Sequence, residues 1–314
     1  MTTNKAYVFV VSLALAFAAN LSPVSLFASP ASSTKRSRSD RDINAIGHRD
    51  IVRGQVRKFI GSPEKEKERG AAWAAVVERS TRLIHDPVLT DYLAALVKNL
   101  ARNSDTQMPI TVVVIDSDEV NACTSPGGYQ YVTRGLLLQL ESEGELAATL
   151  AHGIAHSALH SPTVQAVRQA LMQVPGVTPA RTSPFTWFTC ASQTSQPFRT
   201  IYGLRQAEFD ADYFGVQYLY KSGYDPDSYV RFVERIWAAP LYANGSAMLA
   251  FSQLPPASER VKALRGEITD ILPQRDEATL STSAFQEFKE HLHAFQTQHP
   301  GPKQPVLRRA NSDE

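Results

Sequence analysis

The sequence predicts an α+β fold that is mainly helical and contains a small β-sheet. Two observations predict it. Apolar residues recur at helical spacing over most of the chain between residues 43 and 296, and two short segments in the middle, 110–115 and 129–132, have the character of strands. No internal repeat is present. We therefore expect helices packed around one short sheet.

The individual elements are recognised by composition, alternation and start signals. Residues 110–115 are Ile-Thr-Val-Val-Val-Ile, a run dense in β-branched side chains. Residues 129–132 are Tyr-Gln-Tyr-Val and alternate as a half-exposed strand does. Asp86-Pro87 is a helix start signal. Helices are expected at 43–60, 64–86, 89–103, 133–141, 145–160, 162–172, 199–222, 226–238, 257–268 and 282–296, and a long surface loop is expected at 175–197.

The composition excludes several classes of protein. The 314 residues include 32 Lys and Arg against 31 Asp and Glu, which gives a net charge of +1. We therefore expect no binding to nucleic acid, because no strong field would recruit it. With 43% hydrophobic and 20% charged residues the chain is expected to fold. Two cysteines are too few for a cysteine-built metal cluster, so any metal would have to use histidines and carboxylates.

The beginning of the chain has the pattern of a secretory signal peptide. Lys5 precedes an apolar run, residues 6–19, that is too short to span a membrane comfortably. We expect an exported protein, periplasmic or otherwise extracytoplasmic, with no membrane span in the mature chain. The alternative is an uncleaved membrane anchor at 6–28. The expected organisation is a signal peptide at 1–28, a disordered linker at 29–40, a folded domain at 41–272, a C-terminal helix at 273–298 and a disordered tail at 299–314.

The first chemical signal is His152-Gly-Ile-Ala-His156, which lies in the helix expected at 145–160. Residues four apart project from the same face of a helix, so two imidazoles at this spacing can bind one Zn²⁺ ion. The alternative is that both are ordinary histidines beside the core, because they border an apolar arc that includes Leu150 and Ile154.

The second signal is Glu208, which falls within the apolar stripe of the helix expected at 199–222. An ionised carboxylate there is costly unless it is paired or bound to a metal. Asp212, one turn further on, could accept a hydrogen bond from a ligand imidazole and fix its tautomer. The alternative for Glu208 is a buried ion pair with an arginine, for example Arg205 or Arg231. Two histidines and one carboxylate, with a fourth position open, are the ligand set of a hydrolytic zinc site.

Four segments that follow one another along the chain, set out at the end of this paragraph and including His152 and Glu208, together resemble the gluzincin metallopeptidases. The resemblance is to the subgroup of the CAAX prenyl endopeptidase, HtpX and the BepA-type periplasmic chaperone-proteases. The resemblance implies a zincin-like fold for 41–272. It also implies that one Zn²⁺ ion is bound by His152, His156 and Glu208, and that Asp212 orients a ligand. The motifs are the segments 120–136, 145–152, 208–215 and 223–226.

The resemblance also implies where a polypeptide would bind. The strand near Tyr129 is similar to the sheet edge along which such enzymes align an extended peptide, an arrangement known as strand addition. We therefore expect Gly127, Gly128, Tyr129 and Tyr131 to contact the polypeptide.

The sequence departs from the family pattern at the positions that perform chemistry. The family motif is His-Glu-x-x-His, in which Glu is the general base, but Gly153 occupies that place. A positioned base is worth about 10²–10⁴-fold in rate. Glu145 lies seven residues before His152, about 10 Å away along the helix axis, which is too far for it to replace the missing base. Leu254 stands where the family usually has a histidine that stabilises an oxyanion, a role whose loss costs about 3 kcal/mol.

Three functions remain open at this point. The first is an exported, zinc-binding degenerate peptidase with a chaperone-like or scaffold role on extended or misfolded polypeptides. The second is an active zinc metalloendopeptidase in protein quality control that uses another base. The third is a metal-free binding module. We also expect His160 to face solvent, and we hypothesise a disulfide between Cys123 and Cys190.

Overall fold

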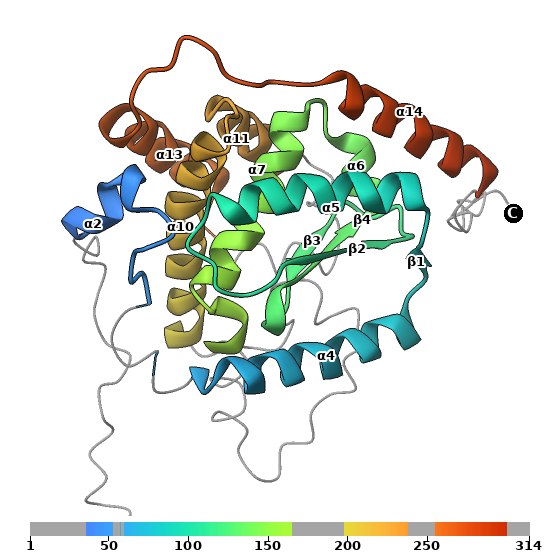
Figure 1. The fold of residues 1–314 in the computed structure, drawn as a ribbon, viewed down its shortest axis with the longest axis horizontal. Helices are drawn as coiled ribbons and strands as arrows, with labels where there is room; N and C mark the ends of the chain where they lie inside the picture. The colour runs from blue at the N-terminus through green and yellow to red at the C-terminus, as the bar shows by residue number, and fades with distance from the viewer. Residues whose placement is uncertain (1–35, 53–56, 58–59, 165–197, 238–254, 300–314) are drawn as a thin grey trace, which may run out of the picture. The chain divides into compact units, whose positions relative to one another are not determined.

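The computed structural model of the chain describes residues 36–52, 57, 60–164, 198–237 and 255–299. Helices dominate and surround a small sheet, so the predicted, mainly helical α+β fold is confirmed (Figure 1). The helices are α2 (Arg38–Arg41), η1 (Ile43–Ala45), α4 (Pro63–Ser80), α5 (Pro87–Arg102), η2 (Pro126–Gly128), α6 (Arg134–Gln139), α7 (Glu143–Ala158), α10 (Phe198–Lys221), α11 (Asp227–Phe232), η3 (Val233–Trp237), α13 (Ala257–Ile271) and α14 (Ser283–Gln298).

The sheet has four strands in the order β1-β2-β4-β3: β1 (Leu83–Ile84), β2 (Thr111–Ile115), β3 (Ala122–Thr124) and β4 (Tyr129–Thr133). β4 runs parallel to β2, with Tyr131 opposite Val113, and antiparallel to β3, with Tyr131 opposite Cys123. The expectation that the strand near Tyr129 forms the sheet edge is therefore wrong. The outermost strand on this side of the described sheet is β3, whose three residues are too few to show an alternating pattern in the sequence.

The two faces of the sheet pack against different helices. On one face Ile115 and Tyr131 are buried with Val77 and Trp73 of α4. On the other face Val132 joins the main core, to which α5, α7 and α10 contribute. Figure 1 shows the sheet between α4 and α5. The helix α7 therefore lies against the face of the sheet that α4 does not cover.

The beginning of the described chain differs from the expected elements. The capped helix α2 begins within residues 37–40, which were placed in the expected linker, and Asp40 is buried. Within the described residues 43–52 of the helix expected at 43–60, only the short turn η1 forms. Gly47 has a φ of 95°, which a helix does not allow, and its N–H donates to Asp105 Oδ1 at 2.7 Å. This tertiary contact overrides the helical spacing.

Other boundaries follow the sequence more closely. α5 begins at the predicted signal, because the Asp86 carboxylate accepts a hydrogen bond from Leu89 N. α4 ends before the expected residue 86, because Leu83 and Ile84 join the sheet as β1. The expected helix 162–172 is described only as far as residue 164, and the expected loop 175–197 lies outside the described residues.

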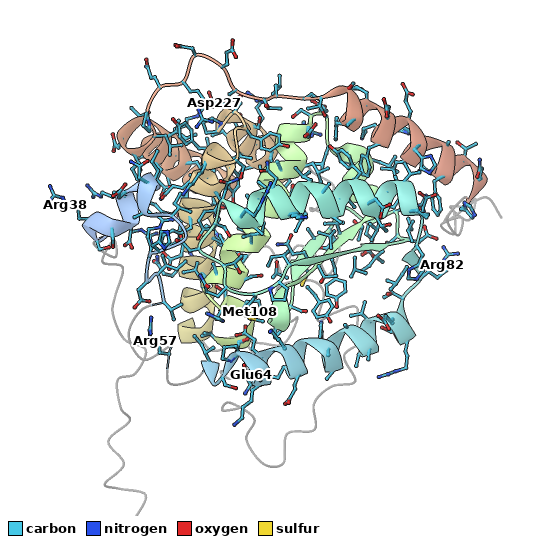
Figure 2. All side chains as sticks on the ribbon, viewed as in Figure 1. Arg38, Arg57, Glu64, Arg82, Met108 and Asp227 are labelled. Carbon is cyan, nitrogen blue, oxygen red and sulfur yellow. The ribbon has the colours of Figure 1, made fainter. Side chains whose placement is uncertain are left out.

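The surface of the described part carries charged side chains on many elements. No helix within these residues is both long and apolar enough to cross a membrane. Figure 2 labels five exposed charged side chains, Arg38, Arg57, Glu64, Arg82 and Asp227, and one buried apolar side chain, Met108.

The pair α7 and α10 forms the centre of the fold. The hydroxyl of Ser142 caps α7 by accepting from Glu145 N. Gly215 allows α10 to approach α7 closely, because a Cβ atom at this position would lie 3.3 Å from His152 Cα. Small, fully buried side chains on α7 help the two helices to pack: Ala147, Ala148, Ala151 and Ala155.

Candidate metal centre

Three potential ligand side chains meet between α7 and α10. His152 and His156 come from α7 and Glu208 from α10, and their ligand atoms lie within 4.8 Å of one another. The two Nε2 atoms are 3.1 Å apart. The carboxylate oxygens of Glu208 lie 3.3 Å from His152 Nε2 and 3.4 Å from His156 Nε2. In a tetrahedral zinc site with metal–ligand bonds of about 2.0–2.1 Å, neighbouring ligand atoms are about 3.3–3.4 Å apart. The three side chains therefore fit one Zn²⁺ ion and leave the fourth position open.

The tautomer of His152 is fixed by groups behind it. His152 Nδ1 lies 2.7 Å from the Tyr229 hydroxyl and 3.2 Å from Asp212 Oδ1. The Tyr229 hydroxyl donates to the same Asp212 oxygen at 3.0 Å, so its own oxygen is left to accept from Nδ1–H. The proton of the neutral ring therefore stays on Nδ1, and the lone pair of Nε2 faces the centre.

A buried arginine completes this arrangement. Arg260 on α13 donates from Nε to Asp212 Oδ2 at 2.7 Å and from Nη2 to Oδ1 at 2.6 Å. Burial alone would raise the pKa of Asp212, but the charge of Arg260 and the contact with His152 hold it below its usual value. The carboxylate therefore remains ionised where it orients the histidine.

The electrostatics of the centre favour a cation. Burial alone would lower the pKa of His152, but its hydrogen bonds to Asp212 and Glu208 raise it to about 9. Burial would raise the pKa of Glu208, but His156 and His152 hold it well below its usual value. The carboxylates of Glu208 and Asp212 thus stabilise positive charge at this centre, and a divalent metal ion would supply such a charge in the same place.

The two arginines named as alternative partners of Glu208 do not pair with it, whereas a third, Arg260, lies at the limit of ion-pair distance. Arg205 binds Glu259 at 3.0 Å, and Arg231 binds Asp225 at 2.7 Å. The nearest guanidinium atom recorded for Glu208 belongs to Arg260, whose Nη1 lies 3.9 Å from Oε2. The main polar neighbours of Glu208 are therefore the two histidines.

Position 153 offers no base. Gly153 follows His152 on α7, and the space beside it is occupied by Gln130 and Thr124. Glu145 is held elsewhere, because it pairs with Arg235 and accepts from Glu141 N at 2.7 Å. Neither residue therefore supplies a carboxylate at the position of the family's base. Leu254 lies outside the described residues.

The residues expected to contact a polypeptide lie in other surroundings. A Cβ atom at Gly127 would lie 3.1 Å from Gly70 Cα on α4, and one at Gly128 would lie 2.1 Å from Pro109 O. Tyr129 stacks on Tyr131, which is 2% exposed. Gly127 therefore packs against α4, and the side chains of Tyr129 and Tyr131 lie on the face of the sheet that α4 covers. The two tyrosines share this face because alternate residues of a strand point to the same side of the sheet.

Two further expectations concern residues outside the centre. His160 does not simply face solvent, because its Nδ1 lies 2.6 Å from Glu66 Oε2 and its side chain is 19% exposed. The proposed disulfide cannot be followed, since Cys190 lies outside the described residues. Sequence reasoning missed Tyr229 altogether. It also gave no role to Arg260, because the contacts of both residues depend on how α11 and α13 pack against α10.

Fold and centre together define a metallopeptidase scaffold, and comparison with known proteins identifies the family. The model of Peptidase family M48 matches residues 87–268, more than half of the chain, and this chain belongs to that family. The predicted resemblance to peptidases of this kind is thereby confirmed.

Individual relatives carry a more particular name. The chain is 26% identical over 232 residues to the beta-barrel assembly-enhancing protease of Yersinia pestis, and the matched region covers 68% of this chain and 46% of that protein. It is 25% identical over 219 residues to the protein of the same name in Escherichia coli, and this match covers 63% of this chain and 43% of the relative. It is 30% identical over 195 residues to a putative beta-barrel assembly-enhancing protease of Vibrio cholerae, and this match covers 58% of this chain and 40% of the relative. The chain thus spans less than half the length of these relatives.

Proposed function

We propose that this chain is an exported, zinc-binding member of family M48 whose peptidase activity is weak or lost. In this proposal it binds extended or misfolded polypeptides of the cell envelope in a chaperone-like or scaffold role. One observation carries the proposal. The side chains that can bind the metal are present in ligand geometry, whereas Gly153 offers no group that could accept a proton from water.

The proposed zinc ligands are His152, His156 and Glu208. Bound zinc would supply Lewis-acid chemistry, by polarising a carbonyl group or lowering the pKa of water. Tyr229 and Asp212 hold the proton of His152 on Nδ1, as a zinc-ligating histidine requires. Proton transfer from an attacking water would still need a base, and its loss lowers the rate by about 10²–10⁴-fold.

The polypeptide partner is proposed from the family and from the names of the relatives. They are called proteases, and a protease scaffold without its base can still bind a chain that it does not cut. Thr124 brings β3 next to Gly153 on the metal-binding helix, so a polypeptide bound along this side of the sheet would reach the centre. Recognition through backbone hydrogen bonds is compatible with a net charge of only +1.

Metal analysis tests the zinc part of this proposal. We expect about one equivalent of zinc in protein purified without chelators, and less than a tenth of that in His156→Ala. His293→Ala is the matched control, because His293 is an exposed histidine on α14. Wild-type protein with less than a tenth of an equivalent would favour the metal-free binding module instead.

Two functional assays test the proposed loss of peptidase activity and the proposed chaperone-like role. We expect little or no chelator-sensitive cleavage of casein. We also expect a stoichiometric amount of the protein to delay aggregation of a chemically unfolded model protein, measured by light scattering. Chelator-sensitive cleavage at the rate of an active relative would refute the loss of peptidase activity. Unchanged aggregation would refute the chaperone-like role.

A further inference from the structure

A buried polar side chain lies where an apolar one would be expected. Gln130 on β4 is 3% exposed and projects to the side of the sheet where α7 packs. Its Nε2 donates to the carbonyl of Leu150 on α7 at 3.3 Å. A buried amide is costly unless it is hydrogen-bonded, so this contact helps to fix where the side chain lies.

The amide of Gln130 occupies the space next to Gly153. A Cβ atom built on Gly153 would lie 2.8 Å from Gln130 Cδ and 2.9 Å from Nε2. It would also lie 2.9 Å from the hydroxyl of Thr124. Each distance is shorter than the contacts that real Cβ atoms make. A side chain at position 153 therefore requires the amide of Gln130 and the hydroxyl of Thr124 to move from the places they occupy here, and the hydrogen bond to Leu150 depends on the place of the amide.

We propose that the amide of Gln130 occupies the space in which the side chain of the general base would lie, and that position 153 is glycine for this reason. Loss of the base then involves two residues, because the amide of Gln130 as placed leaves no room for even a Cβ atom at position 153. An amide can donate and accept hydrogen bonds, but it cannot accept a proton from water near neutral pH. The catalytic consequence rests on the proposed function, whereas the packing of the two residues does not.

The experiment combines substitutions at the two positions. Gly153→Ala and Gly153→Glu are each made in the wild type and in Gln130→Val, which removes the amide but keeps a strand-forming residue. We expect Gly153→Ala and Gly153→Glu to lower the thermal midpoint of the wild type by about 4–8 °C, as overpacking does in a domain of this size. In the Gln130→Val background we expect a loss at least about 3 °C smaller.

Gly266→Ala is the matched control for helix propensity. Gly266 lies within α13, and a Cβ atom there would have nothing within 4 Å. We expect this substitution to raise the midpoint by about 2–4 °C in both backgrounds. Equal losses for Gly153→Ala with and without Gln130 would overturn the proposal.

Zinc content and casein cleavage separate this proposal from the proposed function. We expect Gly153→Glu alone to remain inactive, and the double variant with Gln130→Val to cleave about 10²–10⁴-fold faster than the wild type. Full cleavage by Gly153→Glu alone, with no loss of stability, would overturn the role of Gln130 and would still support a missing base. If no variant binds zinc, the proposed function fails, while the thermal comparison still decides the packing proposal.

Discussion

Tyr229 illustrates how a single hydroxyl can set the chemistry of a metal ligand. It is fully buried and bridges His152 Nδ1 and Asp212. We expect Tyr229→Phe to weaken zinc binding about 10–100-fold, because His152 loses one of the groups that fix its tautomer. Competition with a chromophoric chelator measures this change. Tyr220→Phe is a control, since Tyr220 stacks beneath Arg275 at 4.0 Å. Equal affinities for the wild type and Tyr229→Phe would contradict the role of the hydroxyl.

Glu267 on α13 is a second residue with a testable ionisation. Its Oε2 is buried and has no hydrogen-bond partner among the described residues. Burial and the nearby charges of Asp212 and Asp210 raise its pKa well above 4.5, and Arg36 offsets this only in part. A cavity of about 520 Å³, lined in part by Arg36 and Glu267, lies beside it.

The sign of the effect follows from the direction of this shift. An acid whose pKa is higher in the folded than in the unfolded chain stabilises the fold most at low pH, and this contribution is lost as the pH rises above about 4.5. We expect Glu267→Gln to raise the free energy of unfolding by about 1–3 kcal/mol at pH 8 and to have no effect near pH 4. Denaturant titrations at the two pH values measure this. Glu259→Gln, an exposed change on the same helix, should stay within about 0.5 kcal/mol at both.

At the scale of elements, Lys289 attaches α14 to the end of α6. Its Nζ donates to the carbonyls of Leu137, Leu138 and Leu140, at 3.0, 2.7 and 2.9 Å. We expect Lys289→Met to lower the free energy of unfolding by about 1.5–3 kcal/mol, because these carbonyls lose a charged donor. Lys262→Met, at an exposed lysine of α13, is the control. A loss below 0.5 kcal/mol for Lys289→Met, read by denaturant titration, would show that water satisfies the carbonyls equally well.

The elements also show which parts of the structure the sequence could predict. Long helices with clear periodicity or a start signal, such as α5 and α7, were predicted to within a few residues. The strands β1 and β3 were missed, because two or three residues carry no detectable alternation. The first part of the helix expected at 43–60 was wrong over the described residues 43–52, because a contact between Gly47 and Asp105, distant in sequence, decides the local backbone.

The candidate centre was predictable for a different reason. The spacing of His152 and His156 can be recognised from the sequence alone, and so can a carboxylate within an apolar stripe. The contacts of Tyr229, Arg260 and Gln130 are not visible in that way, because each joins elements that are far apart in sequence. The orientation of the ligands and the obstruction beside Gly153 could therefore be found only in three dimensions.

At the scale of the whole molecule, the metal is expected to contribute to stability. A ligand that binds only the folded chain stabilises it by mass action. With free zinc at about 100 times the dissociation constant, we expect a chelator to lower the thermal midpoint by about 5–10 °C. His152→Ala should show no such response to the chelator, because one of the three ligands is missing. Differential scanning fluorimetry measures both, and identical curves for wild-type protein with and without chelator would contradict the prediction.

The positions of α7 and α10 in the chain give the centre one further property. His156 and Glu208 lie about 50 residues apart in sequence, so an ion bound to both would close a long loop of the chain. In this respect the metal would act as a removable cross-link, comparable to a disulfide but controlled by metal supply rather than by redox potential. If the chain is exported, as we propose, and folds after export, the zinc available in its final compartment would then govern how readily it completes folding.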